Sequence, residues 1–253
     1  MKFSANLGFL WSELSLPDAI RAAKVAGFDA VEMHWPYDTL ASEVIQALSD
    51  TGLPVLGLNT RRGNVEAGQN GLSALPDHTE AARAAIDEAI RYATQIGAQN
   101  VHVMAGFASG PEAERTFCEN LTYAATQAAS HKIGILIEPL NRHDAPGYFL
   151  QTTDQARAII EAVGLPNVKL MFDCYHVGRT EGDVTTRLRD LLPLIGHVQI
   201  ASVPERRAPD QGELNYDAIY QTLEELAWDT PIGAEYKPGG PTEPTLNWLK
   251  AAR

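Results

Sequence analysis

Four short apolar segments of the sequence each end in a side chain that carries an oxygen ligand. The four residues are Glu138, Asp173, Gln199 and Glu235. The C-terminal ends of the strands of a parallel barrel meet at one mouth, where barrel enzymes place their active sites. If these segments are such strands, the four side chains converge on one pocket that offers carboxylate and amide oxygens.

Three carboxylates in one pocket repel one another and raise one another's pKa unless a cation lies between them. A bound divalent metal is the economical way to keep Glu138, Asp173 and Glu235 ionised. Because every member of the set, Gln199 included, offers oxygen, the set favours Mg²⁺, with Mn²⁺ as the alternative, over Zn²⁺, which prefers His and Cys. The other interpretation is that these side chains cap neighbouring loops or pair with arginines.

The remaining predicted strands also end near polar side chains. These are Asn6, Glu32, His34, Asn59 and His102. We expect a single polar residue at a strand end to be structural more often than functional. The functional prediction therefore rests on the joint set of four, and on Asp173 and His176 lying where a buried strand meets its loop.

A repeated order of elements predicts the fold class. Six times a helical pattern is followed by a glycine and then, within a few residues, by a run rich in Val, Ile or Leu. The glycines are Gly27, Gly52, Gly97, Gly134, Gly164 and Gly196. A glycine just past the end of a helix adopts the left-handed conformation that stops it. The pattern therefore predicts helices and strands in strict alternation.

The predicted strands cover residues 3–7, 30–34, 55–59, 101–104, 135–138, 168–173, 198–201 and 232–235. The predicted helices cover residues 15–27, 40–50, 79–96, 112–130, 152–163, 183–195, 216–227 and 244–252. The strands are continuous apolar runs, as in a parallel sheet covered on its faces. The rival, a doubly wound open sheet, lacks support because no glycine-rich phosphate loop follows any strand. We predict an α/β protein with one (β/α)8 TIM-barrel domain spanning residues 1–253.

One long segment interrupts the alternation. Residues 60–76, rich in Gly, Asn and Arg, form a predicted loop longer than compact domains usually contain, and such loops are commonly functional or disordered. Two interpretations stay open, a lid over the pocket and a simple surface excursion.

Charge and composition narrow the class of partner. The net charge of −12 and the pI of about 5.0 argue against a protein that binds nucleic acid mainly by neutralising its phosphates. No run approaches the ~18 apolar residues that a membrane span needs, and the N-terminus lacks the features of a signal peptide. The two cysteines fit no disulfide framework. We expect a cytoplasmic protein with a small-molecule substrate, and a homo-oligomer is compatible with the sequence.

Several motifs resemble those of the hydroxypyruvate isomerases, within the broader superfamily of xylose-isomerase-like barrels. The motifs are Phe3-Ser-Ala-Asn6, Trp35-Pro-Tyr-Asp38, Ile137-Glu-Pro-Leu-Asn141, Asp173-Cys-Tyr-His176, Gly196-His-Val-Gln-Ile-Ala201, Gly212-Glu-Leu-Asn-Tyr-Asp217 and Glu235-Tyr-Lys-Pro238. The resemblance covers essentially the whole chain.

The resemblance implies a role for each candidate residue. Glu138 and Glu235 would be the paired acid/base residues, and these two with Asp173 and Gln199 would hold the metal. The substrate would be bound by three further side chains, namely His176, Arg206 and Lys237. The implied reaction interconverts hydroxypyruvate and tartronate semialdehyde through a cis-enediolate. Related ketose epimerases carry histidine where this chain has Gln199, which favours the hydroxypyruvate branch.

The sequence departs from the family pattern after the third predicted strand. It reads Asn59-Thr-Arg-Arg-Gly63, where the hydroxypyruvate isomerases carry an apolar turn with proline. Arg61 or Arg62 could hold a substrate carboxylate, because a planar guanidinium matches one bidentately, or both could be solvated loop charges. A 2-oxo-tetronate isomerase or a ketose 3-epimerase therefore stays open. An apurinic-site endonuclease or a non-catalytic sugar-acid binder fits the acidic, oxygen-only set less well.

Overall fold

Eight parallel strands close into a barrel in the computed structural model, which describes residues 1–252. Each strand pairs with the next along the chain, and β1 pairs with β8 to close the ring. The strands are β1 (Phe3–Asn6), β2 (Ala30–Met33), β3 (Val55–Asn59), β4 (Asn100–His102), β5 (Gly134–Ile137), β6 (Val168–Asp173), β7 (Ile195–Ile200) and β8 (Ile232–Ala234). This is the predicted TIM barrel.

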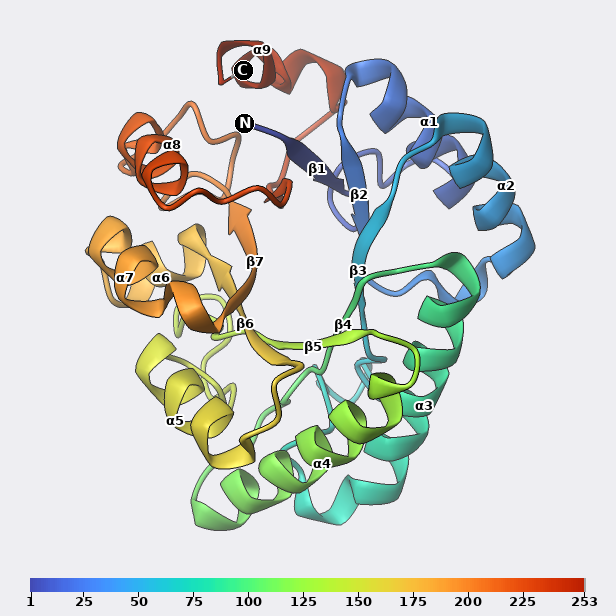
Figure 1. The fold of residues 1–253 in the computed structure, drawn as a ribbon, viewed down its shortest axis with the longest axis vertical. Coiled ribbons are helices and arrows are strands. Elements are labelled where there is room, and N and C mark those ends of the chain that lie inside the picture. The colour runs from blue at the N-terminus through green and yellow to red at the C-terminus, as the bar shows by residue number, and fades with distance from the viewer. Residues whose placement is uncertain (253) are drawn as a thin grey trace.

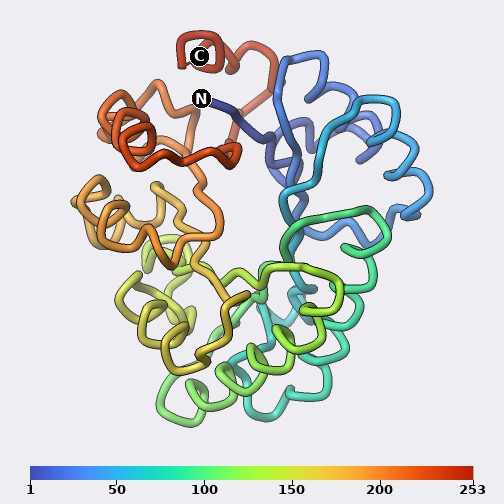
Figure 2. Tube along the Cα trace, viewed as in Figure 1, coloured from blue at the N-terminus to red at the C-terminus, as the bar shows by residue number. Residues whose placement is uncertain are grey.

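The helices lie outside the strands as a surrounding layer (Figure 1), and the trace moves around the ring in chain order (Figure 2). The α-helices are α1 (Leu16–Ala26), α2 (Ala41–Thr51), α3 (Thr79–Ile96), α4 (Pro111–Ala129), α5 (Thr153–Val163), α6 (Cys174–Thr180), α7 (Val184–Leu191), α8 (Tyr216–Glu225) and α9 (Asn247–Ala251). Single 3₁₀ turns are η1 (Pro36–Asp38), η2 (Pro76–His78), η3 (Leu192–Leu194) and η4 (Glu243–Thr245). None of the helices within residues 1–252 has both the length and the apolar character to cross a membrane.

Local signals account for most helix ends. The Ser15 side chain accepts a hydrogen bond from the Asp18 amide and starts α1, as Thr152 does for α5 through the Gln155 amide. Four of the six glycines predicted to stop helices, at positions 27, 52, 97 and 164, adopt positive φ angles. These four confirm the expected mechanism.

Gly134 and Gly196 do not stop helices, and the prediction for them is wrong. Gly134 opens β5 and Gly196 lies within β7. A Cβ at Gly134 would lie 2.3 Å from Asn100 Oδ1, and one at Gly196 would lie 2.7 Å from Lys169 Cβ. Both positions therefore require glycine for close packing between neighbouring strands.

The predicted helix 183–195 is also too long. α7 ends at Leu191, η3 follows, and β7 begins at Ile195, three residues earlier than predicted. Pro193 explains the break, because proline lacks the N–H that would continue a helix. α6 was not predicted at all. It starts directly after β6 with no intervening loop, and the Asp173 carboxylate accepts from the Tyr175 amide as its cap.

The barrel interior holds polar side chains below its mouth. Ser4, Glu32, His197 and Gln199 are all buried there, whereas the layer between strands and helices is apolar. The strands thus position a group of buried polar side chains beneath the mouth of the barrel.

Candidate active site

The structure brings the four predicted oxygen-bearing residues to the mouth of the barrel on four consecutive strands. Glu138 directly follows β5, Asp173 ends β6, Gln199 lies near the end of β7 and Glu235 directly follows β8. Asp173 and Gln199 are partners in the parallel register of β6 and β7. All four are buried, with at most 6% of their surface exposed. Buried carboxylates at this density need a compensating cation.

Arg206 supplies one positive charge to this group. Its Nη2 lies 2.6 Å from Glu235 Oε2 and 3.4 Å from Asp173 Oδ2, so the guanidinium bridges two carboxylates. The Phe9 and Tyr175 rings stack on it, with centroids 4.8 and 4.9 Å from Cζ. The two rings contact a guanidinium that pairs with two carboxylates, and a cation over a ring face is attracted to the ring.

Two further donors hold Glu235. His34 Nε2 lies 2.7 Å from Glu235 Oε1, and Asn6 Nδ2 donates to the same oxygen at 3.0 Å. Burial acts to raise the pKa of Glu235, but Arg206 and the His34 hydrogen bond together lower it to about 2. The loop after β1 is shaped to admit His34, since a Cβ at Gly8 would lie 2.1 Å from His34 Nδ1.

Glu138 and Asp173 are in the opposite electrostatic situation. Burial, followed by the charges of Glu235 and Asp173, raises the pKa of Glu138 well above its ordinary value. Burial also raises the pKa of Asp173 to about 7, although Arg206 opposes the change. One arginine is thus too little positive charge to keep all three carboxylates ionised.

His176 lies in the first turn of α6 and points its Nε2 at the carboxylates. Nε2 is 3.6 Å from Asp173 Oδ2 and 3.8 Å from Glu138 Oε1. On the other side of the ring, the Asn141 amide donates to Nδ1 at 2.9 Å. Burial, and then the charge of Arg206, lowers the pKa of His176 to about 3, so the ring is neutral. A neutral ring that accepts at Nδ1 carries its proton on Nε2.

These observations fit a divalent metal. Glu138, Asp173 and His176 place one potential ligand atom each within 4.8 Å of one another. Glu138 Oε1 and Gln199 Oε1 are both buried and accept no hydrogen bond from any residue that the structure describes. Because the Nε2 proton makes His176 a donor, the oxygens of Glu138, Asp173 and Gln199, with Glu235 beside them, are the better ligand set. A hard cation such as Mg²⁺ would coordinate these unpartnered buried oxygens and offset the excess negative charge beside them.

Three loop cations lie in different surroundings: Lys237, which was predicted to bind the substrate, and Arg61 and Arg62, for which two interpretations were open. Lys237 is exposed, and its backbone amide donates to the Arg206 carbonyl at 2.7 Å. Arg61 pairs through Nε with Glu88 at 2.7 Å and stacks on Tyr37. Arg62 stacks on Trp35, with Cζ 4.8 Å from the ring centroid, and its Nε donates to Asn70 Oδ1 at 2.8 Å.

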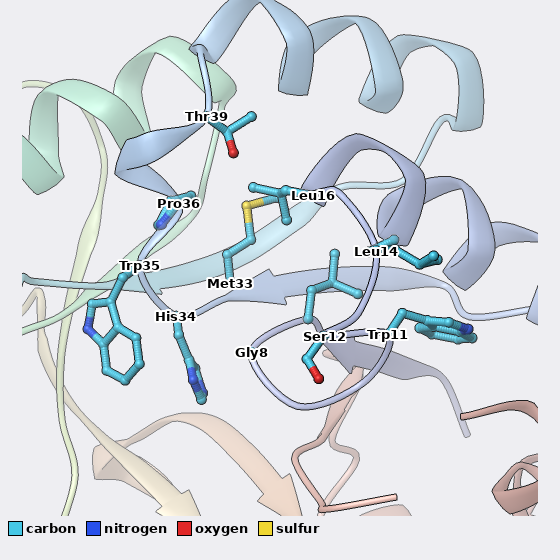
Figure 3. Close-up of a pocket in the computed structure, with 12 residues that line it drawn as sticks. Gly8, Trp11, Ser12, Leu14, Leu16, Met33, His34, Trp35, Pro36 and Thr39 are labelled. Carbon is cyan, nitrogen blue, oxygen red and sulfur yellow. The ribbon is translucent and has the colours of Figure 1, made fainter. Parts of the chain in front are cut away.

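A cavity of about 270 Å³ lies beside β1 and β2, and one of its lining residues, His34, contacts the Glu235 carboxylate. Figure 3 shows His34 and Trp35 on one side of it, and Met33 with Leu14 and Leu16 on the other. His34 therefore separates this mainly apolar space from Glu235, which it contacts. Trp35 extends the wall towards Arg62.

Comparison with known proteins identifies the family. A family model described as xylose isomerase-like TIM barrel matches residues 20–252. The hydroxypyruvate isomerase of Escherichia coli is 36% identical over 258 residues, with both chains covered completely. The chain belongs to the hydroxypyruvate isomerase family. A member from Cupriavidus necator, named 2-oxo-tetronate isomerase, is 42% identical over 253 residues, which cover 98% of this chain and 97% of that protein.

Solved structures share the fold of this chain. A crystal structure from Brucella melitensis, named as a family 2 AP endonuclease, has a TM-score of 0.95 and 36% identity and covers 100% of this chain and 99% of its own. The D-psicose 3-epimerase of Clostridium cellulolyticum has a TM-score of 0.80 at 16% identity, over 97% of this chain and 89% of its own, and shows the fold alone. As a member of the family, the protein is an isomerase.

Several site residues were not singled out from the sequence. Asn6, Glu32, His34 and His102 were recognised as polar strand ends, but their types did not separate them from structural residues. Asn141 was part of the Glu-Pro-Leu-Asn motif without a role. The structure explains it, because the Asn141 amide fixes the tautomer of His176.

Proposed function

We propose that the protein interconverts hydroxypyruvate and tartronate semialdehyde with a divalent metal, through a cis-enediolate. The observation that carries this proposal is the pair of buried glutamates, Glu138 and Glu235, at the mouth of the barrel, with the donors His176 and Arg206 beside them. An isomerisation between neighbouring carbons needs one group to remove a proton and one to return it. Two carboxylates in one water-poor pocket can do both.

The metal would be held by Glu138, Asp173, Gln199 and Glu235, with Mg²⁺ the first choice and Mn²⁺ the alternative. When bound, it would act as a Lewis acid that polarises the substrate carbonyl. The chain's own residues do the rest. One glutamate takes the proton from the carbon beside the carbonyl, and a proton is returned to the former carbonyl carbon. The proton of the neighbouring hydroxyl passes to the former carbonyl oxygen, so that the hydroxyl and carbonyl groups exchange places. His176 Nε2–H and the Arg206 guanidinium donate to the substrate oxygens while charge develops on them.

A second candidate substrate is the longer acid 2-oxo-tetronate. Arg62 supports it, because its guanidinium is held flat on Trp35, next to His34 and hence to Glu235. An arginine held flat is suited to bind a carboxylate. Arg61 is a poor candidate because it is already paired with Glu88. A ketose 3-epimerase is less well supported, since Gln199 stands where those enzymes carry histidine.

The decisive experiment follows the products by NMR with each of the two acids, first in chelator and then with Mg²⁺ restored. We expect turnover to be lost in chelator and to return with the metal. Glu235→Gln should lower kcat by at least about 100-fold, which is the scale of general acid–base catalysis. Full activity in the metal-free enzyme, or wild-type turnover by this variant, would contradict the proposal.

A matched pair of variants tests whether Arg62 binds the substrate carboxylate. If 2-oxo-tetronate is the substrate and Arg62 binds its carboxylate, Arg62→Ala raises KM by about tenfold or more, the value of a charged hydrogen bond. Arg61→Ala, which removes an exposed ion pair with Glu88 and a ring contact with Tyr37, should leave KM within about twofold. Equal effects of the two variants on KM would show that Arg62 does not bind the substrate.

A further inference from the structure

Below the mouth of the barrel, one buried carboxylate collects three hydrogen bonds. Glu32 on β2 accepts from Ser4 Oγ at Oε1 at 2.8 Å, and at Oε2 from Gln199 Nε2 at 2.8 Å and His197 Nε2 at 2.9 Å. Glu32, His197 and Gln199 are each at most 4% exposed. This network lies inside the barrel and takes no part in the proposed proton transfer.

The network decides which way the Gln199 amide faces. The oxygen and nitrogen of an amide side chain are nearly identical in shape, so its hydrogen bonds determine its orientation. An ionised carboxylate can only accept, so the Gln199 Nε2 must face Glu32 and the Oε1 must face away. That oxygen is the buried one without a partner among the described residues.

The surrounding strands leave the amide little freedom to turn. Gly233 on β8 is the register partner of both Ser4 and Gln199, and a Cβ there would lie 2.1 Å from Glu32 Oε1 and 2.8 Å from Gln199 Cγ. The remaining space at this level of the barrel is about 10 Å³, which holds at most one water. The glycine leaves room for the network and for little else.

We propose that Glu32 is a positioning residue for the metal site: it holds the Gln199 amide with its oxygen towards the metal. The proposal rests on the proposed function, since it requires Gln199 to be a ligand. Without the acceptor at position 32, the amide can present its NH₂ group to the cation, which it cannot ligate. Residues that orient a metal ligand typically change metal affinity by about 10- to 100-fold when they are replaced.

The test measures Mn²⁺ affinity of the full-length metal-free protein by EPR of the free ion. Glu32→Met, which removes the acceptor, should weaken binding by about 10- to 100-fold. Ser4→Ala is the matched control, because it removes a partner of Glu32 and leaves the Gln199 hydrogen bond. It should change affinity by less than about threefold. In a Gln199→Ala background, Glu32→Met should have no further effect, because its only route to the metal is gone.

The outcomes separate this proposal from the proposed function. No Mn²⁺ binding by the wild type would remove the metal site itself. Wild-type affinity in Glu32→Met, or an equal loss with and without Gln199, would show that Glu32 does not act through Gln199.

If Glu32→Met does not fold, an isosteric exchange replaces it. Gln199→Glu alone puts two carboxylates in contact and should weaken Mn²⁺ binding. The pair E32Q with Q199E restores a donor at position 32 and should recover at least tenfold of that loss. Equal affinity of the single and double variants would overturn the proposal.

Discussion

The tautomer of His176 decides what this residue can do in the site. The Asn141 amide occupies Nδ1, so Nε2 carries a proton and faces the carboxylates. A ring nitrogen that carries a proton donates a hydrogen bond and does not ligate a metal. This tautomer fits the proposed role in substrate binding, although the distance of His176 to Glu138 and Asp173 would also suit a ligand.

We predict that His176→Ala lowers kcat/KM by about 10- to 100-fold, the value of a hydrogen bond to a group that gains charge. Mn²⁺ affinity should stay within about threefold of the wild type. Steady-state kinetics and a Mn²⁺ titration on the same protein check both statements. His176→Gln, which keeps a donor near Nε2, should recover part of the activity. A large loss of Mn²⁺ affinity in His176→Ala would make the residue a ligand instead.

His102 gives the protein a specific sensitivity to acid. Burial lowers the pKa of His102 from 6.5 to about 4. Between pH 6.5 and pH 4, His102 binds a proton in the unfolded chain but not in the folded protein. Stability therefore falls as the pH drops from about 6.5 towards 4. At pH 5 this linkage costs about 2 kcal/mol relative to pH 8. Above pH 6.5 the residue has no such effect.

We predict that His102→Asn reduces the loss of unfolding free energy between pH 8 and pH 5 by about 2 kcal/mol. Urea unfolding at the two pH values measures it, and the difference between variant and wild type cancels the titration of the carboxylates. His131→Asn, at an exposed position, is the control. An unchanged pH dependence in His102→Asn would mean that His102 accepts its proton in the folded protein.

At the scale of elements, the long loop at 60–76, for which both a lid and a surface excursion were open, has a C-terminal half that is packed in place. Gly71 forms an isolated bridge with Ala105 beyond the end of β4, and Leu72, Ser73 and Ala74 are buried. The stretch at 63–68 is exposed. The long loop is therefore anchored at its C-terminal part, and any closing motion would belong to the exposed part.

Two glycines of this loop test the anchor as a matched pair. Both have positive φ, so both lose about 1 kcal/mol or more when a Cβ is added. A Cβ at Gly68 meets nothing within 4 Å, whereas one at Gly71 would lie 2.7 Å from the backbone of both Met104 and Gly106. We predict that Gly71→Ala costs at least about 2 kcal/mol more than Gly68→Ala, since backbone cannot yield cheaply. Urea midpoints compare them, and equal costs would mean that the loop is not docked.

The sequence was sufficient for the strands and insufficient for some of the elements between them. Continuous apolar runs such as 135–137 are unambiguous because both faces of a barrel strand are buried. α6 was missed because it has 7 residues, contains Gly178 and follows β6 without a turn, so it shows no helical period. The prediction for Gly196 was wrong because the sequence does not distinguish a glycine required for close strand packing from a glycine that stops a helix.

The candidate site, too, could be predicted only in part from the sequence. Glu138, Asp173, Gln199 and Glu235 could be found because each ends an apolar run and because strand ends of a barrel converge. The residues that form hydrogen bonds with these four could not be found from the sequence. Glu32 and Gln199 are 167 positions apart, and the Asn6 to Glu235 hydrogen bond spans 229. Such pairs depend on the register of strands that meet only when the barrel closes.

Closure would let the whole molecule respond as a unit to a bound metal. β1 is hydrogen-bonded to β8, so every strand of the ring has a neighbour on both sides. The proposed ligands lie on β6 and β7 and directly after β5 and β8, and binding a cation links strands from one half of the ring. We propose that residues 1–253 form one domain that unfolds in a single transition, with or without the metal.

We predict one heat-absorption peak in calorimetry, and a higher Tm when Mn²⁺ is added to the metal-free protein. At 100 times the Kd, a ligand that binds only the folded state adds about 2.7 kcal/mol. For a chain of this size each kcal/mol raises Tm by about 2–4 °C, so the shift should be roughly 5–11 °C. Glu138→Gln, which loses a ligand charge, should show a much smaller shift. Glu138 lies directly after β5 and Glu235 directly after β8. Two peaks that respond separately to Mn²⁺ would therefore mean that these parts of the ring unfold independently. A Tm shift that is retained in Glu138→Gln would place the cation elsewhere.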